Sequence, residues 1–443
     1  MPTVAPTSTP IPGIPTHIAT WAYDEYLGQG SAGTAAQAQT YLTYAEAGFG
    51  NLKAVKDCAG SNACSSVYYF DPNYVYHNGD CTGVYEQTLF AAANESWFLH
   101  HSGFSDTTHR LIGHRNLDCH GVKVAQPVYG LDHYNPDVRA FIENYLRTYA
   151  DSFDYIFLDE TSSHIITQLY GPGGGMCADN PPWHLCSTTQ EYPDDASLLQ
   201  GHHLLFSNLT HSNGSLMRLF FNPLTLDQGK ATDLDLIATN TNVFGGMCED
   251  CVVSLGKFRP DDYVAVLDAM AQVNAIPGAQ FIQLNIGNDP VGSDQLTGER
   301  NVMAAMTWLG YSPGHTVAFP DLEYGSNDLA IWPEYSIVPM NPVESMSTSF
   351  QDIQVSTSPR VYRREFRTCY NFGVPIGQCA AIVNGGGSQS ITVSASWLQL
   401  NYGHVIQFSG GDIPSGGTVL LNSTPFVPSQ TTIAPGHGIL LAR

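Results

Sequence analysis

The alternation of short apolar runs with helical stretches is the feature that most restricts how this chain can fold. From His17 onward, eight apolar runs alternate with segments of helical character, as in barrels that take up roughly 250 residues. The runs are continuously apolar, which is expected when both faces of a parallel sheet are buried. The pattern predicts an α/β fold, a (β/α)8 TIM barrel. The predicted strands are 17–23, 50–57, 121–128, 155–158, 217–222, 242–249, 281–287 and 315–320.

The clearest helix lies just before the fourth predicted strand. Asn135 is a suitable N-cap, and Pro136 suits the first helical position. Apolar residues recur at helical spacing after it, and they form one face: Val138, Phe141, Ile142, Tyr145, Leu146 and Tyr149. The helix delivers the chain to FDYIFLDETSSH, where an apolar strand runs directly into two acids.

The style of the sequence changes after Trp332. Short alternating runs separated by Gly, Ser, Asn and Pro predict a C-terminal antiparallel β-sandwich. We therefore expect a Pro/Thr/Ser-rich linker at 1–15, a catalytic barrel at 16–335 and the sandwich at 336–443. Two long inserts in the barrel, 59–120 and 161–205, hold five of the ten cysteines and are expected to form walls of a site.

The charge balance excludes several classes of partner. Among 443 residues, 17 Lys and Arg face 40 Asp and Glu, for a formal net charge of −23. Such a surface repels phosphate backbones and anionic lipid, so we expect neither a nucleic-acid nor a membrane partner. No apolar run approaches the length of a membrane span, so we expect a soluble protein, and a monomer.

Ten cysteines, an even number in Gly-, Asn- and Pro-rich loops, predict disulfides and an oxidising, extracellular address. Cys369–Cys379 and Cys177–Cys186 are the expected bridges because each closes a short loop. Cys248 and Cys251 form a C-x-x-C, but no second pair with zinc-site spacing follows, so zinc is disfavoured. We interpret Met1 as standing where an export signal was removed.

Acids and amides follow the predicted strands at the end where barrel enzymes place their active sites. Two carboxyl groups with surrounding polar groups suit glycoside hydrolysis, which needs neither metal nor cofactor. The candidate substrate-binding residues are Asp24, Asp57, Asp132, Glu160, Asn222, Asp250, Asn285 and Asp321, and Asp159 and Glu249 are two further acids at these strand ends.

Several segments resemble bacterial glycosyl hydrolases related to the α-galactosidase clan. YGLDHYNPDVRAFIENYLRTYADSFDYIFLDET is similar to their helix-to-strand unit, and NVFGGMCED to a later strand ending in Glu. VYRREF, AAIVN and IAPGHGILLAR resemble their C-terminal sandwich. Tyr155, where that family usually has Gly, and the segment TCYNFGVPIGQC depart from the pattern.

This resemblance implies roles for the two catalytic candidates. In that clan the nucleophile ends the fourth strand and the acid/base ends the sixth, which here gives Asp159 and Glu249. Asp250 is the alternative acid/base, since a shift of one residue in register exchanges it with Glu249. The resemblance favours a retaining mechanism on an oligosaccharide or polysaccharide.

Three other functions compete with this hypothesis. A serine hydrolase is suggested by Gly310-Tyr-Ser312-Pro-Gly314, but Pro313 has no N–H for an oxyanion hole, so we predict a turn. A metal hydrolase is suggested by the histidines of the first insert, although no H-E-x-x-H occurs: His100, His101, His109, His114 and His120. A barrel that binds glycans without cleaving them is the third.

Overall fold

The computed structural model describes most of the chain, and all structural statements refer to that part. The described residues are 11–22, 46–49, 65–76, 84–100, 103–107, 110, 112–115, 126–161, 190–224, 226–227, 230–231, 233–254, 256–286, 294–321, 332–346, 349–411, 413 and 416–443. Within them, no helix is long and apolar enough to cross a membrane.

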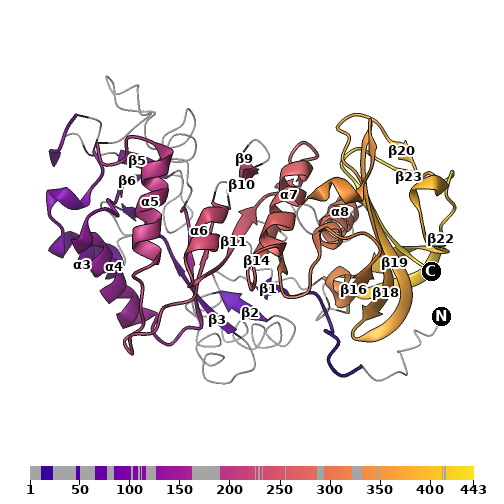
Figure 1. The fold of residues 1–443 in the computed structure, drawn as a ribbon, viewed down its shortest axis with the longest axis horizontal. Helices are drawn as coiled ribbons and strands as arrows, with labels where there is room; N and C mark the ends of the chain where they lie inside the picture. The colour runs from indigo at the N-terminus through magenta and orange to yellow at the C-terminus, as the bar shows by residue number, and fades with distance from the viewer. Residues whose placement is uncertain are drawn as a thin grey trace. The chain divides into compact units, whose positions relative to one another are not determined.

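The fold is mixed α/β, with an eight-stranded parallel sheet and separate antiparallel sheets (Figure 1). The parallel strands follow the order β1-β2-β3-β7-β8-β11-β14-β15. Their bounds are β1 (Trp21–Ala22), β2 (Ala47–Phe49), β3 (Ser65–Phe70), β7 (Tyr155–Leu158), β8 (Leu219–Phe221), β11 (Val243–Glu249), β14 (Gln280–Ile286) and β15 (Thr316–Asp321).

Chain contacts divide the protein into two compact units, each of which is described by itself. The first unit comprises Met1–Val67, Leu226–Ala231 and Gly245–Arg443, and the second comprises Tyr68–Thr225 and Thr232–Phe244.

In the first unit, parallel pairing runs through both ends of the strand order. β11 pairs with β14, and β14 with β15. Thr20, next to β1, forms an isolated parallel bridge with Ala318 of β15, and Ala318 N–H donates to Ala19 O at 2.8 Å. β1 then pairs with β2, and β2 with the start of β3.

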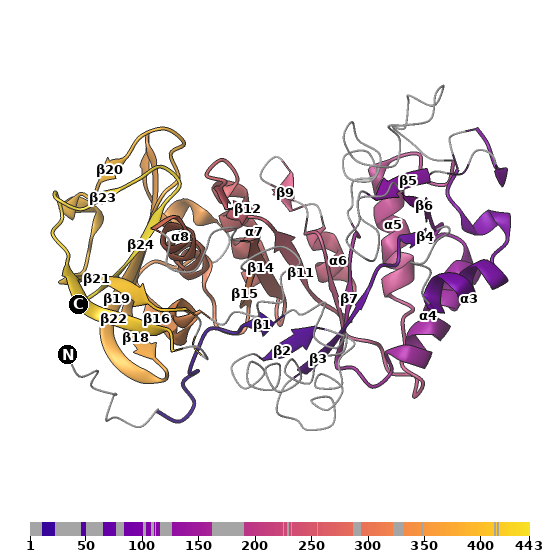
Figure 2. The ribbon, with the colours of Figure 1, turned by 180° about the vertical axis from the view of Figure 1, so that it is seen from behind.

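The second unit contains the end of β3, β7, β8 and the start of β11. Ile156 to Leu158 of β7 are paired in parallel with Leu219 to Phe221 of β8, and all six residues are buried. A separate antiparallel sheet joins β4 (Tyr74–Tyr76), β6 (Gln126–Gly130) and β5 (Ile112–Arg115), which lie together in Figure 2. The helices of this unit are α3 (Val84–Ala92), α4 (Pro136–Tyr149), α5 (Asp195–Phe206) and α6 (Leu234–Thr239).

Helix α4 confirms the prediction made from its spacing. The Asn135 side chain accepts from Asp137 N–H at 2.9 Å, and Pro136 occupies the first turn. Val138, Ile142 and Leu146 are fully buried on one face, as the apolar pattern requires, whereas Tyr149, predicted on the same face, is 45% exposed.

One predicted strand is wrong. The third strand of the parallel sheet is β3, inside the segment 59–120 that was interpreted as an insert, and not 121–128. Residues 126–130 instead form β6, which pairs antiparallel with β4 and β5. The Ser and Tyr residues make SSVYYF less apolar in composition than the other strands, although four of its six residues are buried. The predicted second strand, 50–57, lies outside the described residues, and β2 at Ala47–Phe49 precedes it.

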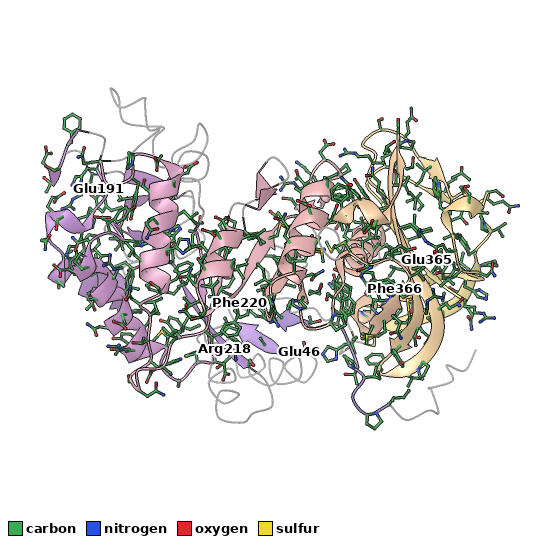
Figure 3. The ribbon with its side chains drawn as sticks, in the orientation of Figure 1. Glu46, Glu191, Arg218, Phe220, Glu365 and Phe366 are labelled. Carbon is green, nitrogen blue, oxygen red and sulfur yellow. A yellow bond between two sulfur atoms is a disulfide. The ribbon has the colours of Figure 1, made fainter. Side chains whose placement is uncertain are left out.

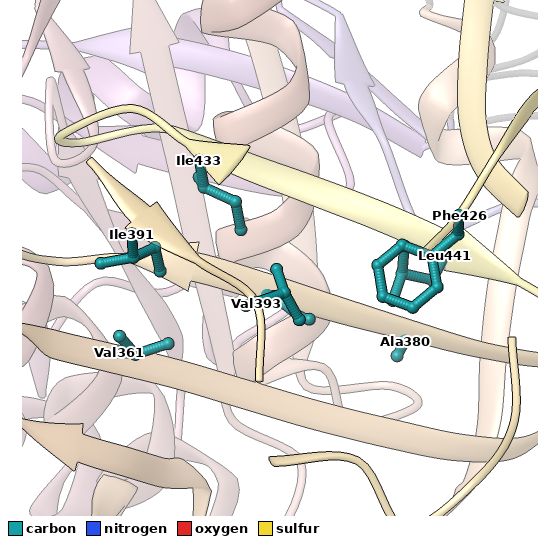
Figure 4. Close-up of a cluster of buried hydrophobic side chains, with 8 residues drawn as sticks. Val361, Ala380, Ile391, Val393, Phe426, Ile433 and Leu441 are labelled. Carbon is teal, nitrogen blue, oxygen red and sulfur yellow. The ribbon is translucent and has the colours of Figure 1, made fainter. Parts of the chain in front are cut away.

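The C-terminal part is antiparallel, as expected. A seven-stranded sheet contains β16 (Ile337–Pro342), β17 (Gln354–Thr357), β18 (Arg360–Asn371), β19 (Val374–Asn384), β21 (His404–Ser409), β22 (Thr418–Pro425) and β24 (Gly438–Ala442). The pair β20 (Ile391–Thr392) and β23 (Thr432–Ile433) packs on it through a buried apolar cluster (Figure 4). Members of the cluster include Val361 and Leu441 from the large sheet, Ile391 and Ile433 from the β20/β23 pair, and Val393 and Phe426.

Helix α8 (Asp294–Gly310) fastens this sheet within the first unit, and the views in Figures 1 and 2 show it beside β19 and β24. A Cβ on Gly438 of β24 would meet Ala305 of α8 at 2.8 Å, so the close approach requires glycine. Arg364 of β18 donates to Leu309 O and Tyr311 O at 2.9 and 2.8 Å, which satisfies carbonyls at the C-terminus of the helix. Its neighbours Glu365 and Phe366 are marked in Figure 3.

The disulfide Cys369–Cys379 is present, as predicted from its loop length. It joins β18 and β19, whose connection contains Phe372 and Gly373 at φ 49° and 74°. Positive φ at both turn residues is typical of the tight turns that match strand twist. The predicted pair Cys177–Cys186 lies outside the described residues.

Candidate active site

The carboxylate of Asp159 is held by three hydrogen-bond donors directly after the buried strand β7. Asn222, after β8, donates from Nδ2 to Oδ1 at 2.7 Å, and the N–H of Glu160 donates to the same oxygen at 2.8 Å. The hydroxyl of Tyr69 donates to Oδ2. These hydrogen bonds fix the orientation of the carboxylate, and Asp159 as a residue is only half-buried.

Tyr69 on β3 is one of the site residues that sequence reasoning missed. Its side chain is 37% exposed, and its ring stacks on Phe157 of β7 with centroids 6.1 Å apart. Asp71 and Asn73 follow the end of β3 in the same way that Asp159 follows β7. The signal was available, because VYYFD has the same form as YIFLD: an apolar run closed by an acid.

The residue after Asp159 has a left-handed backbone. Glu160 has a φ of 54°, which costs an L-residue roughly 1–2 kcal/mol. Its carbonyl accepts from Asn73 Nδ2, and the N–H of Thr161 donates to Asn222 O at 2.7 Å. Glu160 therefore lies in a tight turn beyond the strand, where strand alternation does not determine the direction of its side chain.

In the first unit, the end of β11 carries the second pair of acids. Glu249 is the last strand residue, and Asp250 follows it at a φ of 57°. Asp250 Oδ2 accepts from Ser254 Oγ at 2.9 Å, and burial raises the pKa of this carboxyl. Asp159 and Glu249, the two predicted catalytic acids, therefore both lie at the carboxyl end of a parallel strand. Each is followed by a residue other than glycine with a left-handed backbone.

Two features hold the turn after β11. Cys248 and Cys251 form a disulfide with each other, which leaves no thiolates for the zinc site weighed above. Asn285 on β14 is buried, and its Oδ1 accepts from Val252 N–H and Val253 N–H at 3.2 and 3.3 Å. The side-chain oxygen of Asn285 thus supports the loop that contains Asp250.

The remaining predicted site residues are placed as follows. Asp132 follows β6 of the antiparallel sheet, so it does not end a parallel strand as expected. It is buried, its Oδ1 accepts from Tyr134 N–H at 2.9 Å, and burial, reinforced by the charge of Glu191, raises its pKa to about 6. Asp321 is the last residue of β15, but its side chain lies outside the described part. Asp24 and Asp57 also lie outside it.

The motif around Ser312 is a turn, as predicted. It connects α8 to the start of β15, where Ser312 N–H donates to Thr316 Oγ1 at 3.0 Å. This is the amino end of a parallel strand, away from the carboxyl ends at which active sites form.

Two of the histidines of the first insert lie in the described part: His114 is on β5, with its side chain outside that part, and His100 belongs to an ion-pair network. It is 2% exposed and lies between Glu191 (Figure 3) and Glu95, with N–O distances of 2.8 and 2.9 Å. Burial alone would lower the pKa of His100, but the two carboxylates outweigh burial and raise it. Among the described residues, no group of three or more His, Cys, Asp or Glu side chains is arranged to hold a metal ion.

The sequence matches no protein-family model and no curated protein. Solved structures that share a distant likeness include a trehalulose synthase (8% identity, 97% of this chain and 99% of that chain, TM-score 0.48). An α-glucosyl transfer enzyme shares 11% identity, over 97% of this chain and 99% of that chain, with a TM-score of 0.46. The α-galactosidase of Thermus thermophilus shares 10% identity, over 68% of this chain and 58% of that chain, with a TM-score of 0.36.

Proposed function

We propose that this protein is a secreted glycoside hydrolase that cleaves an oligosaccharide or polysaccharide with two carboxylates and retention of configuration. Asp159 is the nucleophile and Glu249 the acid/base, with Asp250 as the alternative acid. The eight parallel strands form a closed (β/α)8 barrel, and the antiparallel C-terminal part is its sandwich. The protein acts as a monomer and uses no metal or cofactor.

The observation that carries this proposal is the fixation of Asp159 by Tyr69, Asn222 and the N–H of Glu160. A nucleophile in a displacement at a sugar carbon must be held in the direction of attack, because orientation supplies much of the rate. Glycosidic cleavage needs two carboxyl groups, and the proposal assigns these roles to Asp159 and Glu249.

Substrate recognition would draw on the polar residues of the same strand ends. Glu160, Asn222, Asp250 and Asn285 are the described candidates at these strand ends, and Asp24, Asp57 and Asp321 complete the proposed set there. Asp132, which follows β6 of the antiparallel sheet, is proposed as a further candidate. The exposed ring of Tyr69 adds an apolar surface of the kind on which a pyranose can lie.

A panel of aryl glycosides and soluble polysaccharides tests the proposal. The wild type should hydrolyse at least one substrate, and Asp159→Asn should lower kcat/KM at least about 1,000-fold, as expected when the reacting group is removed. Asp154→Asn is the matched control, since Asp154 is exposed before the start of β7. It should retain full activity.

Two outcomes would overturn the proposal. Binding of a glycan without hydrolysis of any substrate would favour the non-catalytic barrel. Near-wild-type turnover by a folded Asp159→Asn variant would reject Asp159 as nucleophile.

A further inference from the structure

We propose that Asn73 and His202 are positioning residues that aim Asp159 by holding the left-handed turn at Glu160. The inference rests on the proposed function in one respect, that Asp159 is the catalytic carboxylate. The contacts themselves are independent of it. All the residues involved belong to the second unit.

The amide of Asn73 has one possible orientation. It is 5% exposed, and its Nδ2 donates to the carbonyl of Glu160. A carbonyl oxygen can only accept, so the nitrogen of the amide faces Glu160 and the oxygen faces the other way. That oxygen lies 3.3 Å from Nε2 of His202.

The orientation of Asn73 fixes the tautomer of His202. An amide oxygen requires a donor, so Nε2 of His202 carries the hydrogen. The imidazole is fully buried on α5, where it stacks on Phe206 with centroids 5.9 Å apart. Burial lowers the pKa of His202 well below its ordinary value, which keeps the ring neutral.

The chemistry of His202 indicates that its role is to donate a hydrogen bond from Nε2 to Asn73. Its Nδ1 is buried and has no hydrogen-bond partner within the described part of the chain. A buried polar atom without a partner is costly, so an apolar residue of similar size would suit this position better if packing were its only role. The hydrogen bond from Nε2 to Asn73 is the feature that such a residue would lose.

The peptide group between Glu160 and Thr161 is hydrogen-bonded through both its carbonyl and its N–H. Asn73 holds the carbonyl of Glu160, and the carbonyl of Asn222 accepts from the N–H of Thr161 at 2.7 Å. A left-handed residue persists only where its surroundings determine it. If Asn73 were released, Glu160 could relax toward a right-handed conformation and withdraw its N–H from Asp159.

A second histidine secures the segment that carries Asn73. His133 is buried, and its Nε2 lies 3.0 Å from the carbonyl of Pro72, the residue before Asn73. Its ring centroid is 5.6 Å from that of His202. Neither imidazole is exposed, so both act through other residues and do not touch substrate.

The test compares variants that keep or remove the donor. His202→Gln retains an N–H that can reach Asn73, whereas His202→Leu removes it. Asn73→Ala removes the hydrogen bond to the carbonyl of Glu160 itself. Phe206→Leu is the matched control, because it disturbs the same core beside His202 and leaves the hydrogen bond in place. Activity on the best substrate of the panel and hydrogen–deuterium exchange of a peptide covering 156–161 are both measured.

We expect His202→Leu and Asn73→Ala to lower kcat by roughly 100-fold with KM within a factor of about two, as for a misaligned reacting group. Exchange in the 156–161 peptide should be faster in both. His202→Gln and Phe206→Leu should stay within about threefold of wild-type kcat, with unchanged exchange.

Two results would overturn the positioning role of Asn73 and His202, called here the relay. One is unchanged exchange in both His202→Leu and Asn73→Ala, and the other is equal effects of His202→Gln and His202→Leu on kcat. Because Asn73→Ala probes the same contact from the other side, the inference stays testable if His202→Leu does not fold. The exchange measurement also separates the two proposals. Faster exchange in a protein without glycosidase activity would reject the proposed function and retain the relay.

Discussion

Asn222 donates a hydrogen bond of 2.7 Å to the carboxylate of Asp159, so the end of β8 supports the acid at the end of β7. Asn222 is itself 4% exposed, and its backbone N–H donates to Leu158 O at 2.9 Å. The amide is therefore fixed by the sheet, and it presents a donor to a carboxylate that must be oriented.

Replacing this donor by an acid should shift the pH dependence of activity. Asn222→Asp puts a second carboxyl beside Asp159, and two adjacent carboxylates oppose each other's ionisation. The acidic limb of the kcat/KM profile should move upward by about one pH unit or more. Asn208→Asp, at an exposed asparagine after α5, is the control. An unshifted limb in a folded Asn222→Asp variant would show that Asp159 is not the ionising group.

Glu249 and Asp250 can be distinguished by how the rate depends on the leaving group. A general acid matters most for substrates whose leaving group is a poor one. Glu249→Gln should lower kcat about 100-fold or more on alkyl glycosides and much less on nitrophenyl glycosides, whereas Asp250→Asn should affect both alike. The reverse pattern would transfer the role to Asp250, whose pKa burial raises.

The stability of the protein should depend on pH through two buried groups with opposite signs. Burial raises the pKa of Asp132 to about 6, so its contribution is present below pH 3.8 and is lost as the pH rises through 6. Burial lowers the pKa of His133 to about 4, so its contribution is present above pH 6.5 and is lost as the pH falls through 4. The two effects oppose each other between these limits.

Asp132→Asn should therefore make the protein more sensitive to acid. Between pH 6.5 and 4.5, the variant should lose about 2 kcal/mol more of its unfolding free energy than the wild type loses. Urea denaturation at both pH values measures this difference, with the exposed Asp154→Asn as control. A loss no larger than that of the wild type would contradict the assignment for Asp132.

The bridge Cys369–Cys379 should contribute measurably to folding. Its sequence separation of 10 corresponds to about 3 kcal/mol in the loop-entropy model. The double variant Cys369→Ala/Cys379→Ala should have an unfolding free energy lower by that amount, and it should unfold at a lower urea concentration. Reductant should destabilise the wild type and so reduce the difference in unfolding free energy between the two proteins. The matched control is the double variant Cys248→Ala/Cys251→Ala, whose cysteines are separated by 3 residues. It should lower the unfolding free energy by less. Equal midpoints for wild type and the first variant would contradict this expectation.

Some of this structure could be predicted from the sequence because it depends on local patterns. The spacing of Val138, Ile142 and Leu146 predicts α4, and the apolar run before Asp159 predicts β7. The loop length between Cys369 and Cys379 predicts their pairing. Each of these needs only neighbouring residues and the preference of apolar side chains for burial.

Other features depend on contacts that distant segments create. The acid that closes VYYFD indicates a strand, but only its pairing partners place β3 third in the parallel sheet. The sequence does not indicate the left-handed backbone of Glu160, because Glu rarely adopts it, whereas Asp250 is of a residue type that is enriched in that conformation. The contact of Asn73 with Glu160 joins positions 87 residues apart.

Covalent labelling of the protein tests the central claim most directly. A retaining enzyme forms a glycosyl ester on its nucleophile, and a 2-deoxy-2-fluoro glycoside with an activated leaving group allows that ester to accumulate. Mass spectrometry after proteolysis should find one glycosyl group on the peptide that contains Asp159, and none in Asp159→Asn. A label on any other carboxylate, or steady turnover of the matching substrate with no label at all, would contradict the account.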